Sequence, residues 1–199
     1  LLICTWISLI FVSGVNILFL FLLFIFVIFL FLILLYLAPE KFSYIITRIT
    51  SFFDPTKTNN SQSQKAIEAI KQGGLKGEGM GEGILKESVP EAHTDYIIAV
   101  ISEEFGSIVS IFVISIFLFI AFRIVKKIIN SSNNFYKLSL CGLSSLLVFQ
   151  TFIHVGVNAN LLPTTGMTLP FLSYGGSSLL SSGVLAGVIL NYTSLGVKN

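Results

Sequence analysis

The sequence predicts an all-α membrane protein that crosses the bilayer about five times and carries one large polar loop. Of the 199 residues, 54% are hydrophobic and only 11% are charged, whereas a soluble domain carries about 25% charged residues. Apolar runs of membrane-spanning length recur, and 15 of the 22 charged residues lie between Glu40 and Asp95. This composition excludes an ordinary soluble enzyme, a nucleic-acid-binding domain and a disordered tail. The net charge of +2 is too small to indicate a polyanionic partner.

Residues 1–37 are predicted to form two membrane-spanning helices, because this charge-free run is too long for a single span. We place the break at Ser13–Asn16, so that the first span ends near Val12. The chain starts inside an apolar run and without Met, and we therefore expect this first span to be truncated. The second span, Ile17–Leu37, has Phe and Leu on every face, which predicts contact with lipid on all sides.

The remaining boundaries follow from the apolar runs and from the distribution of Lys and Arg. The segment 123–137 holds four basic residues and no acidic one, so the positive-inside rule predicts a cytoplasmic loop there. Pro163 and Pro170 predict a hydrophobic, non-helical connection between the last two spans. In chain order we predict an extracytoplasmic loop at 38–95, spans at 96–122, 138–157 and 174–192, an extracytoplasmic re-entrant hairpin at 158–173, and a cytoplasmic C-terminal tail at 193–199.

Two features stand out within the large loop. Residues 64–71 have helical periodicity, with Ala66, Ile67 and Ile70 on one face. We expect a short amphipathic helix that lies on the membrane surface or packs against the spans. Residues 73–83 hold six glycines in eleven positions. A phosphate-binding backbone nest is one interpretation. A tightly turned or flexible connector is favoured, because neither a Walker motif nor a dinucleotide motif is present.

Polar residues gather where the large loop meets the next span. Thr94 or Asp95 is suited to cap the N-terminus of that span. A metal site is the alternative, since Glu91, His93 and Asp95 offer oxygen and imidazole ligands. Their spacing matches no recognised ligand motif.

Three ionisable residues are predicted to lie within the spans. Glu103 and Glu104 are about two turns into the span at 96–122, where carboxylates require a hydrated cavity. A break at Ser102–Gly106 would instead keep both carboxylates near the membrane surface. For His154, in the fourth span, a hydrogen-bonded contact between helices is the favoured interpretation.

Two stretches carry a resemblance to a known family. Pro90–Ile97 (PEAHTDYI), followed by Glu103–Gly106 (EEFG), resembles the first signature of the SEDS family, the shape, elongation, division and sporulation proteins. Leu162–Gly166 (LPTTG), followed by Leu169–Ser178 (LPFLSYGGSS), resembles that family's second signature. The resemblance covers nearly the whole chain but only the C-terminal half of the family architecture, which implies five helices of a ten-helix bundle. The LPTTG motif is more similar to the division branch than to the elongation branch.

The resemblance implies an activity and a set of site residues. SEDS proteins are peptidoglycan glycosyltransferases that polymerise lipid II, a disaccharide-pentapeptide on an undecaprenyl diphosphate carrier. They work with a class B penicillin-binding protein and other division proteins. The resemblance implies Asp95 as the general base of an inverting reaction. It implies Arg48 and Lys86 as ligands of the diphosphate, and Glu91 and His93 as further candidates for positioning or for metal binding. It further implies Mg²⁺ or Mn²⁺ as the candidate metal, no nucleotide or organic cofactor, no nucleic-acid partner, and a place in the bacterial plasma membrane at the division septum.

The chain departs from the family pattern at three places. The family usually has Tyr-Gln at Ser61–Gln62, usually has Asn at His154, and often has Gly at Asn160. Two other functions stay open. A lipid II flippase would depend on His154 and the two intramembrane carboxylates more than on Asp95. A non-catalytic scaffold, or an inactive fragment, would only contact division partners.

Overall fold

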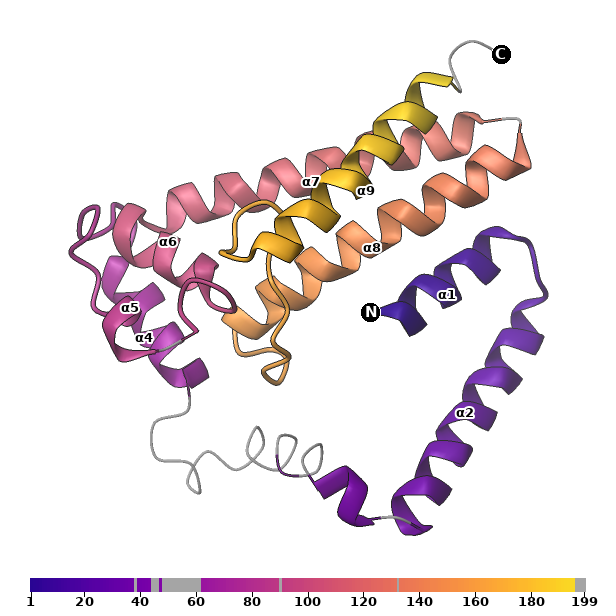
Figure 1. Cartoon of the computed structure of the whole chain (residues 1–199), viewed down its shortest axis with the longest axis horizontal. Helices are drawn as coiled ribbons and strands as arrows, with labels where there is room; N and C mark the ends of the chain where they lie inside the picture. Colours follow the sequence, from indigo (N-terminus) through magenta and orange to yellow (C-terminus); the bar gives the residue numbers. More distant parts are fainter. Residues whose placement is uncertain (38, 44–46, 48–61, 90, 132, 196–199) are drawn as a thin grey trace.

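The computed structural model describes residues 1–37, 39–43, 47, 62–89, 91–131 and 133–195, and every regular element in these ranges is helical. Long helices form a bundle, short helices gather at one end of it, and one helix extends away from it (Figure 1). The all-helical prediction is therefore confirmed. The elements are α1 (Leu2–Val12), α2 (Ile17–Leu37), η1 (Pro39–Phe42), α4 (Gln62–Gly73), α5 (Leu85–Ser88), α6 (Ile97–Phe105), α7 (Ser107–Asn130), α8 (Asn134–Asn158) and α9 (Gly176–Leu195).

Three helices in the described part of the chain are long and apolar enough to cross a membrane, namely α2 over Leu18–Leu37, α7 and α8. Helix α1 is apolar but has 11 residues, and α9 mixes apolar residues with serine and glycine. Helices thus occupy all five places where spans are predicted. Membrane crossing by α1 and α9, and the side on which each loop lies, stay predictions.

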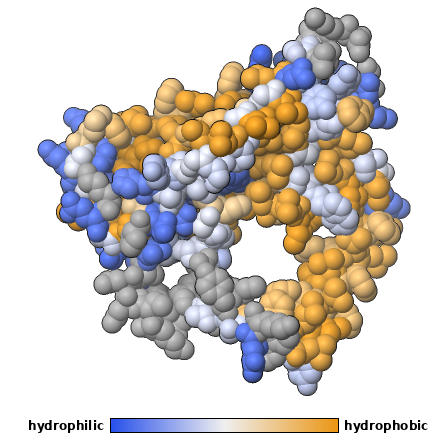
Figure 2. Space-filling model, viewed as in Figure 1, coloured by the Kyte–Doolittle hydropathy of each residue, from blue (hydrophilic) through white to orange (hydrophobic). Residues whose placement is uncertain are grey.

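Helix α2 is apolar on every face and exposes almost all of its surface. None of its membrane-spanning window is buried inside the protein, and Figure 2 shows it as a continuous hydrophobic arm. A helix without a polar face would be unstable in water, so its natural solvent is lipid or another apolar helix. The predicted break before it is confirmed, since α1 ends at Val12 and α2 begins at Ile17.

The predicted continuous span at 96–122 is wrong, because α6 ends at Phe105 and α7 begins at Ser107. Gly106 lies between them with φ of 87°. The cause is the glycine-rich loop at residues 73–83. Its backbone pairs with Glu103 and Ser107, whose carbonyl and amide would bond to each other in a continuous helix. The amide of Ser107 donates to the carbonyl of Gly74 at 2.9 Å, and the carbonyl of Glu103 accepts from Glu78 at 2.9 Å. The alternative prediction of a break near Ser102–Gly106 is confirmed.

The predicted basic loop at 123–137 is also wrong, because α7 continues as a helix to Asn130. Ile124 and Ile128 are buried one turn apart on this extension and pack against α8 and α9. The buried apolar side of α7 therefore continues past Arg123, the first charged residue of this helix. Helix α7 thus ends at Asn130, and α8 begins at Asn134 with a side-chain cap. The Asn133 side chain accepts from the amide of Phe135 at 2.9 Å.

The predicted hairpin at 158–173 corresponds to the non-helical segment 159–175, which contains both prolines. Side chains satisfy part of its backbone, as buried non-helical chain requires. Gln150 of α8 donates to the carbonyl of Thr168 at 2.8 Å. The Thr168 hydroxyl lies 2.7 Å from the Ser178 hydroxyl of α9. The hairpin is thus fixed to the two helices that it joins.

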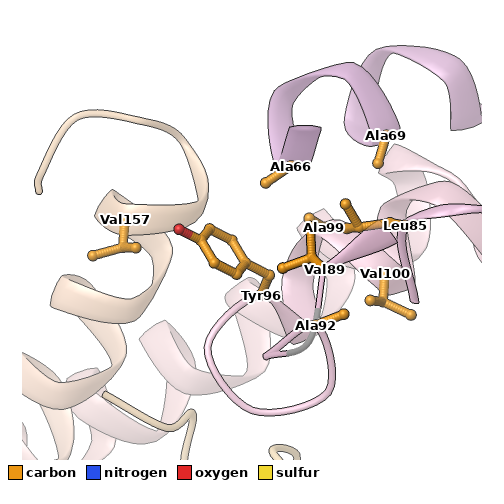
Figure 3. Close-up of a cluster of buried hydrophobic side chains, with 9 residues drawn as sticks. All are labelled: Ala66, Ala69, Leu85, Val89, Ala92, Tyr96, Ala99, Val100 and Val157. Atoms are coloured by element: carbon orange, nitrogen blue, oxygen red, sulfur yellow. The ribbon is translucent and has the colours of Figure 1, made fainter. Parts of the chain in front are cut away.

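Helices α4 and α5 pack on α6 and on the C-terminal end of α8 rather than standing apart from the bundle. The predicted amphipathic helix at 64–71 is confirmed and extends two residues further at each end. Its Ala66 and Ala69 are buried, whereas Glu68 is exposed. Figure 3 shows the hydrophobic cluster, in which the Tyr96 ring extends from the start of α6 toward Val157 of α8. Of the two predicted places for this amphipathic helix, the membrane surface or the surface of the spans, the structure shows packing against the helices.

Candidate active site

The segment 91–96 forms a compact turn before α6, and it contains Asp95. The amide of Asp95 donates to the carbonyl of Glu91 at 2.9 Å, and the Thr94 hydroxyl donates to the Glu91 carboxylate at 2.6 Å. The N-cap residue of α6 is Tyr96, with no side-chain capping bond. The prediction that Thr94 or Asp95 caps this helix is therefore wrong. The turn places both residues ahead of the cap residue.

Three successive carbonyls of this turn accept hydrogen bonds from the hairpin and the end of α8. The carbonyl of His93 accepts from the amide of Tyr174 at 3.0 Å. That of Thr94 accepts from the Ser173 hydroxyl at 2.7 Å. That of Asp95 accepts from the Asn158 amide group at 2.9 Å. The two sequence signatures, about 80 residues apart, are thus joined at His93 and Thr94, and Asn158 of α8 bonds to the next carbonyl, that of Asp95.

Asn158 is the best-connected side chain of this group. It is 1% exposed, and its oxygen accepts from the amide of Ala99, an N–H near the start of α6, at 3.0 Å. Its NH₂ group donates to the carbonyls of Asp95 and of His154, the latter at 2.8 Å. A buried amide with its groups paired in this way fixes geometry, because breaking any one bond leaves a polar group without water. Asn158 therefore holds the chain on both sides of Tyr96.

The Asp95 side chain itself is half-buried at the mouth of α6. Gly166 of the hairpin lies against it, and a Cβ atom at Gly166 would stand 3.8 Å from Oδ2 of Asp95. An open, mostly apolar cavity of about 620 Å³ begins beside His93 and runs along hairpin residues 171–176. Asp95 does not line this cavity itself, but His93, two residues earlier on the same turn, and Ile97, two residues later, both do.

Glu103 is 1% exposed, and its carboxylate bonds to backbone amides rather than facing water. It accepts from the amide of Ile84 at 2.8 Å and from that of Leu85 at 3.2 Å. A Cβ atom at Gly83 would stand 2.6 Å from Oε2 of Glu103, so the close approach of this loop requires glycine. The expected hydrated cavity is replaced by a glycine-rich loop closed on α6. The connector interpretation of residues 73–83 is the one that fits.

The structure brings three of the predicted site residues together and leaves two undescribed. Glu91, His93 and Asp95 share the turn before α6, with Glu91 and His93 exposed. Arg48 lies outside the described residues. Lys86 belongs to α5, but its side chain is outside the described set.

Within the residues that the structure describes, no three His, Cys, Asp or Glu side chains are close enough to share one ion. The Glu91 carboxylate is also engaged by the Thr94 hydroxyl. The role of Mg²⁺ or Mn²⁺ stays a prediction, and no step below uses a metal.

Sequence reasoning missed two positioning residues, Asn158 and Ser173. The sequence could have indicated Asn158, since it is a polar residue one turn after His154 at the end of an apolar helix. His154 is completely buried, and its Nδ1 lies 3.4 Å from the Asn158 amide nitrogen. Ser173 stood inside the second signature, but only the fold shows that its hydroxyl links Thr94 to the amide of Leu169.

Comparisons with known proteins agree with these features. A sequence model of the FtsW/RodA/SpoVE family, described as "cell cycle protein", matches residues 1–195. A Caulobacter vibrioides relative named "Probable peptidoglycan glycosyltransferase FtsW" is 42% identical over 149 residues, which are 75% of this chain and 38% of the relative. The Bacillus subtilis protein of the same name is 42% identical over 154 residues, or 72% of this chain and 38% of the relative. The chain thus spans about two fifths of the length of these curated relatives.

A solved structure shares the fold. It is described by the words "Structural coordination of polymerization and crosslinking by a peptidoglycan synthase complex". The TM-score is 0.70 at 21% sequence identity, and the match covers 99% of this chain and 55% of the other. The apolar helices, the two joined signatures and the family match lead to one conclusion. The chain is a multi-pass membrane protein that belongs to the SEDS family of FtsW, RodA and SpoVE.

Proposed function

We propose that this chain takes part in polymerising lipid II into glycan strands during septal cell-wall synthesis, with Asp95 as the general base. The observation that carries the proposal is the set of three hydrogen bonds that fixes the backbone from His93 to Asp95. A catalytic base must be held within hydrogen-bond reach of the proton that it removes. A half-buried carboxylate on a fixed turn, whose neighbours His93 and Ile97 line an open cavity, meets that requirement.

The proposed step is a single displacement. The acceptor hydroxyl gives its proton to the Asp95 carboxylate while its oxygen forms a bond to C1 of the donor sugar. The bond from C1 to the diphosphate breaks, and its electron pair leaves with the diphosphate. Attack opposite the leaving group turns an α-linked donor into a β-linked product, so one base and no covalent nucleophile are needed. The relatives named as peptidoglycan glycosyltransferases support this reaction class.

Other residues of the proposed site have supporting roles. Lys86 lies on α5, directly after Leu85, one of the two residues whose amides bind Glu103, and together with Arg48 it would neutralise the leaving diphosphate. Glu91 would position the turn through Thr94, to which it is bonded. His93 is exposed at the edge of the cavity and is placed to contact the bound substrate.

We place the protein in the bacterial plasma membrane at the division septum, with its C-terminus in the cytoplasm. A class B penicillin-binding protein is the proposed partner. The structural neighbour is described as a complex that coordinates polymerization and crosslinking, which supports a crosslinking partner. The relatives that carry the division name FtsW support the septal role.

The competing function is lipid II transport. It would require Glu103 to face a translocation path, whereas its carboxylate is bound by two backbone amides of the large loop.

The test uses sealed vesicles that contain the protein, its partner and labelled lipid II, and it measures glycan strands and transbilayer movement together. We expect strands from the wild type and none from Asp95→Asn. Movement of lipid II without any Asp95-dependent polymer would overturn the proposal.

A further inference from the structure

A second candidate site lies at the opposite end of the bundle from Asp95. The C-terminal ends of α7 and α9 and the start of α8 meet there (Figure 1). Two adjoining cavities share Arg123, Lys127 and Thr193 in their walls. The first, of about 310 Å³, is here named the basic cavity. The second, of about 540 Å³, runs between α7 and α9 and is here named the apolar groove.

Among the described residues that line it, the basic cavity has positive side chains and no carboxylate to balance them. Arg123, Lys126 and Lys127 all line it, and they lie three and four residues apart, which places them on one side of the helix. Glu104 is the last acidic residue of the sequence, so the part of the chain that builds this end contains no Asp or Glu. Like charges at this spacing repel one another. An anion in the cavity would remove that repulsion.

An aromatic cluster marks the depth of this cavity in the membrane. Phe135, Tyr136 and Tyr192 contact one another edge to face, with ring centroids 5.7 to 6.3 Å apart. Tyr136 and Tyr192 also line the basic cavity. Tyrosine concentrates at the membrane–water interface, where the ring is apolar and the hydroxyl is wet. The basic cavity therefore lies at the level of the lipid headgroups.

The apolar groove then lies below the headgroups, in the hydrocarbon. It runs along α9 from Ala186 to Ser194, which is about 12 Å at the rise of an α-helix. One leaflet of the hydrocarbon core is about 15 Å thick. Phe119 of α7 and Phe171 of the hairpin also line it, and Thr193 lines both this groove and the basic cavity. This groove has the length and polarity of one acyl chain that enters from a headgroup.

We propose that this end of the bundle binds an anionic phospholipid of the surrounding bilayer. Its phosphate occupies the basic cavity, where the Arg123 guanidinium and the Lys127 ammonium bind it, and one acyl chain fills the apolar groove. The bound lipid joins α7 to α9, which both pack on α8. The basic cavity is separate from Asp95, since about 20 residues of α7, or about 30 Å, separate Ser107 from Lys127. The apolar groove includes Phe171, which also lines the cavity beside His93.

The simpler explanation of these charges is topological, because basic residues gather at cytoplasmic loops whatever they bind. That explanation treats every basic residue at this end alike. Lys137 on α8 is basic and lies at the same end but lines neither cavity. Lys137→Gln is therefore the matched control, since it removes one charge without touching the proposed site.

The test titrates the purified protein in detergent with dioleoylphosphatidylglycerol or with dioleoylphosphatidylcholine, and native mass spectrometry counts the bound lipids. We expect the wild type to prefer the anionic lipid. Each charge removed is expected to weaken its binding about fivefold, so Arg123→Gln with Lys127→Gln gives about 25-fold. Lys137→Gln is expected to change it less than twofold. Equal affinity for the two lipids, or unchanged binding by the double variant, would overturn the proposal.

A second variant tests the groove without touching the charges. Ala186→Phe fills the groove from α9 and is expected to weaken binding of the anionic lipid at least tenfold, with the helical circular dichroism signal unchanged. Binding that is indifferent to this substitution would mean that the chain does not enter the groove, or that another protein segment covers it, and would contradict the proposal. If the double variant loses helical structure, Ala186→Phe and the wild-type headgroup preference decide the question.

Discussion

Removing the Glu103 carboxylate is expected to release the glycine-rich loop from α6. In the wild type this carboxylate accepts from the amides of Ile84 and Leu85, and it is 1% exposed. Glu103→Ala leaves both amides without that partner. The Leu85 side chain is 2% exposed, so water does not readily replace the lost bond there. Ile84 is 57% exposed, so its amide is the easier one to solvate.

The expected loss follows from these two bonds. A buried donor left unsatisfied costs about 1–3 kcal/mol, and a bond to a charged group is worth about 1.5–3 kcal/mol. With one amide buried and one partly exposed, we expect the closed loop to lose about 2–4 kcal/mol. At about 1.4 kcal/mol for each factor of ten, local opening becomes about 30-fold to 700-fold more frequent. Glu103→Gln keeps one acceptor oxygen and is expected to fall between the wild type and Glu103→Ala.

Hydrogen–deuterium exchange followed by mass spectrometry measures this opening directly. The informative peptide covers residues 82–89, which contain both amides and lead to the turn before α6. Glu68→Gln is the control, because Glu68 lies on the exposed face of α4 and its removal changes the net charge equally. Exchange at this peptide that differs less than threefold between Glu103→Ala and the control would refute the reasoning.

Two further predictions concern the loop and the positioning of Asp95. Gly106→Ala is expected to lower the thermal unfolding midpoint, because φ is 87° and a Cβ atom would strike the Leu75 carbonyl. With ψ of 165° as well, this backbone lies in a region essentially restricted to glycine and costs other residues about 1–3 kcal/mol. Gly187→Ala, in a helix with open space around it, is expected to leave that midpoint unchanged or raise it. Asn158→Ala removes the bonds to Asp95 and Ala99 and is expected to lower kcat for polymerisation about 10- to 100-fold with little change in KM. Steady-state kinetics measure kcat and KM separately. A loss of kcat/KM that comes only from a higher KM, with kcat unchanged, would contradict a positioning role.

The helices that contact lipid were predictable from the sequence because their causes are local. Backbone in lipid must satisfy its hydrogen bonds within the helix, so a long apolar run can form little else. This gives the bounds of α2, Ile17–Leu37, to the residue. The hairpin was predictable for the same reason, since Pro163 and Pro170 interrupt the helical bonds. Asp95 is a candidate because of a motif, and the structure adds how the backbone of that motif is held.

The errors have long-range causes. The break at Gly106 depends on a loop about 30 residues earlier, whose amides bond to α6, and no local pattern specifies that pairing. The extension of α7 past Arg123 depends on burial of Ile124 and Ile128 against other helices. A sequence pattern records which residues are apolar, but it does not record which partner will cover them. Asn158 was missed for this reason, since two of its bonds span 59 and 63 residues.

The central claim is that Asp95 removes the acceptor proton in glycan polymerisation. The most direct measurement is the initial rate of strand formation from labelled lipid II by the protein and its penicillin-binding partner. Asp95→Asn is compared with Glu91→Gln, a carboxylate on the same turn, at equal thermal stability. Since general base catalysis contributes about 10²- to 10⁴-fold, Asp95→Asn is expected to lose that factor and Glu91→Gln less than tenfold. A rate for Asp95→Asn within tenfold of the wild type would contradict the account.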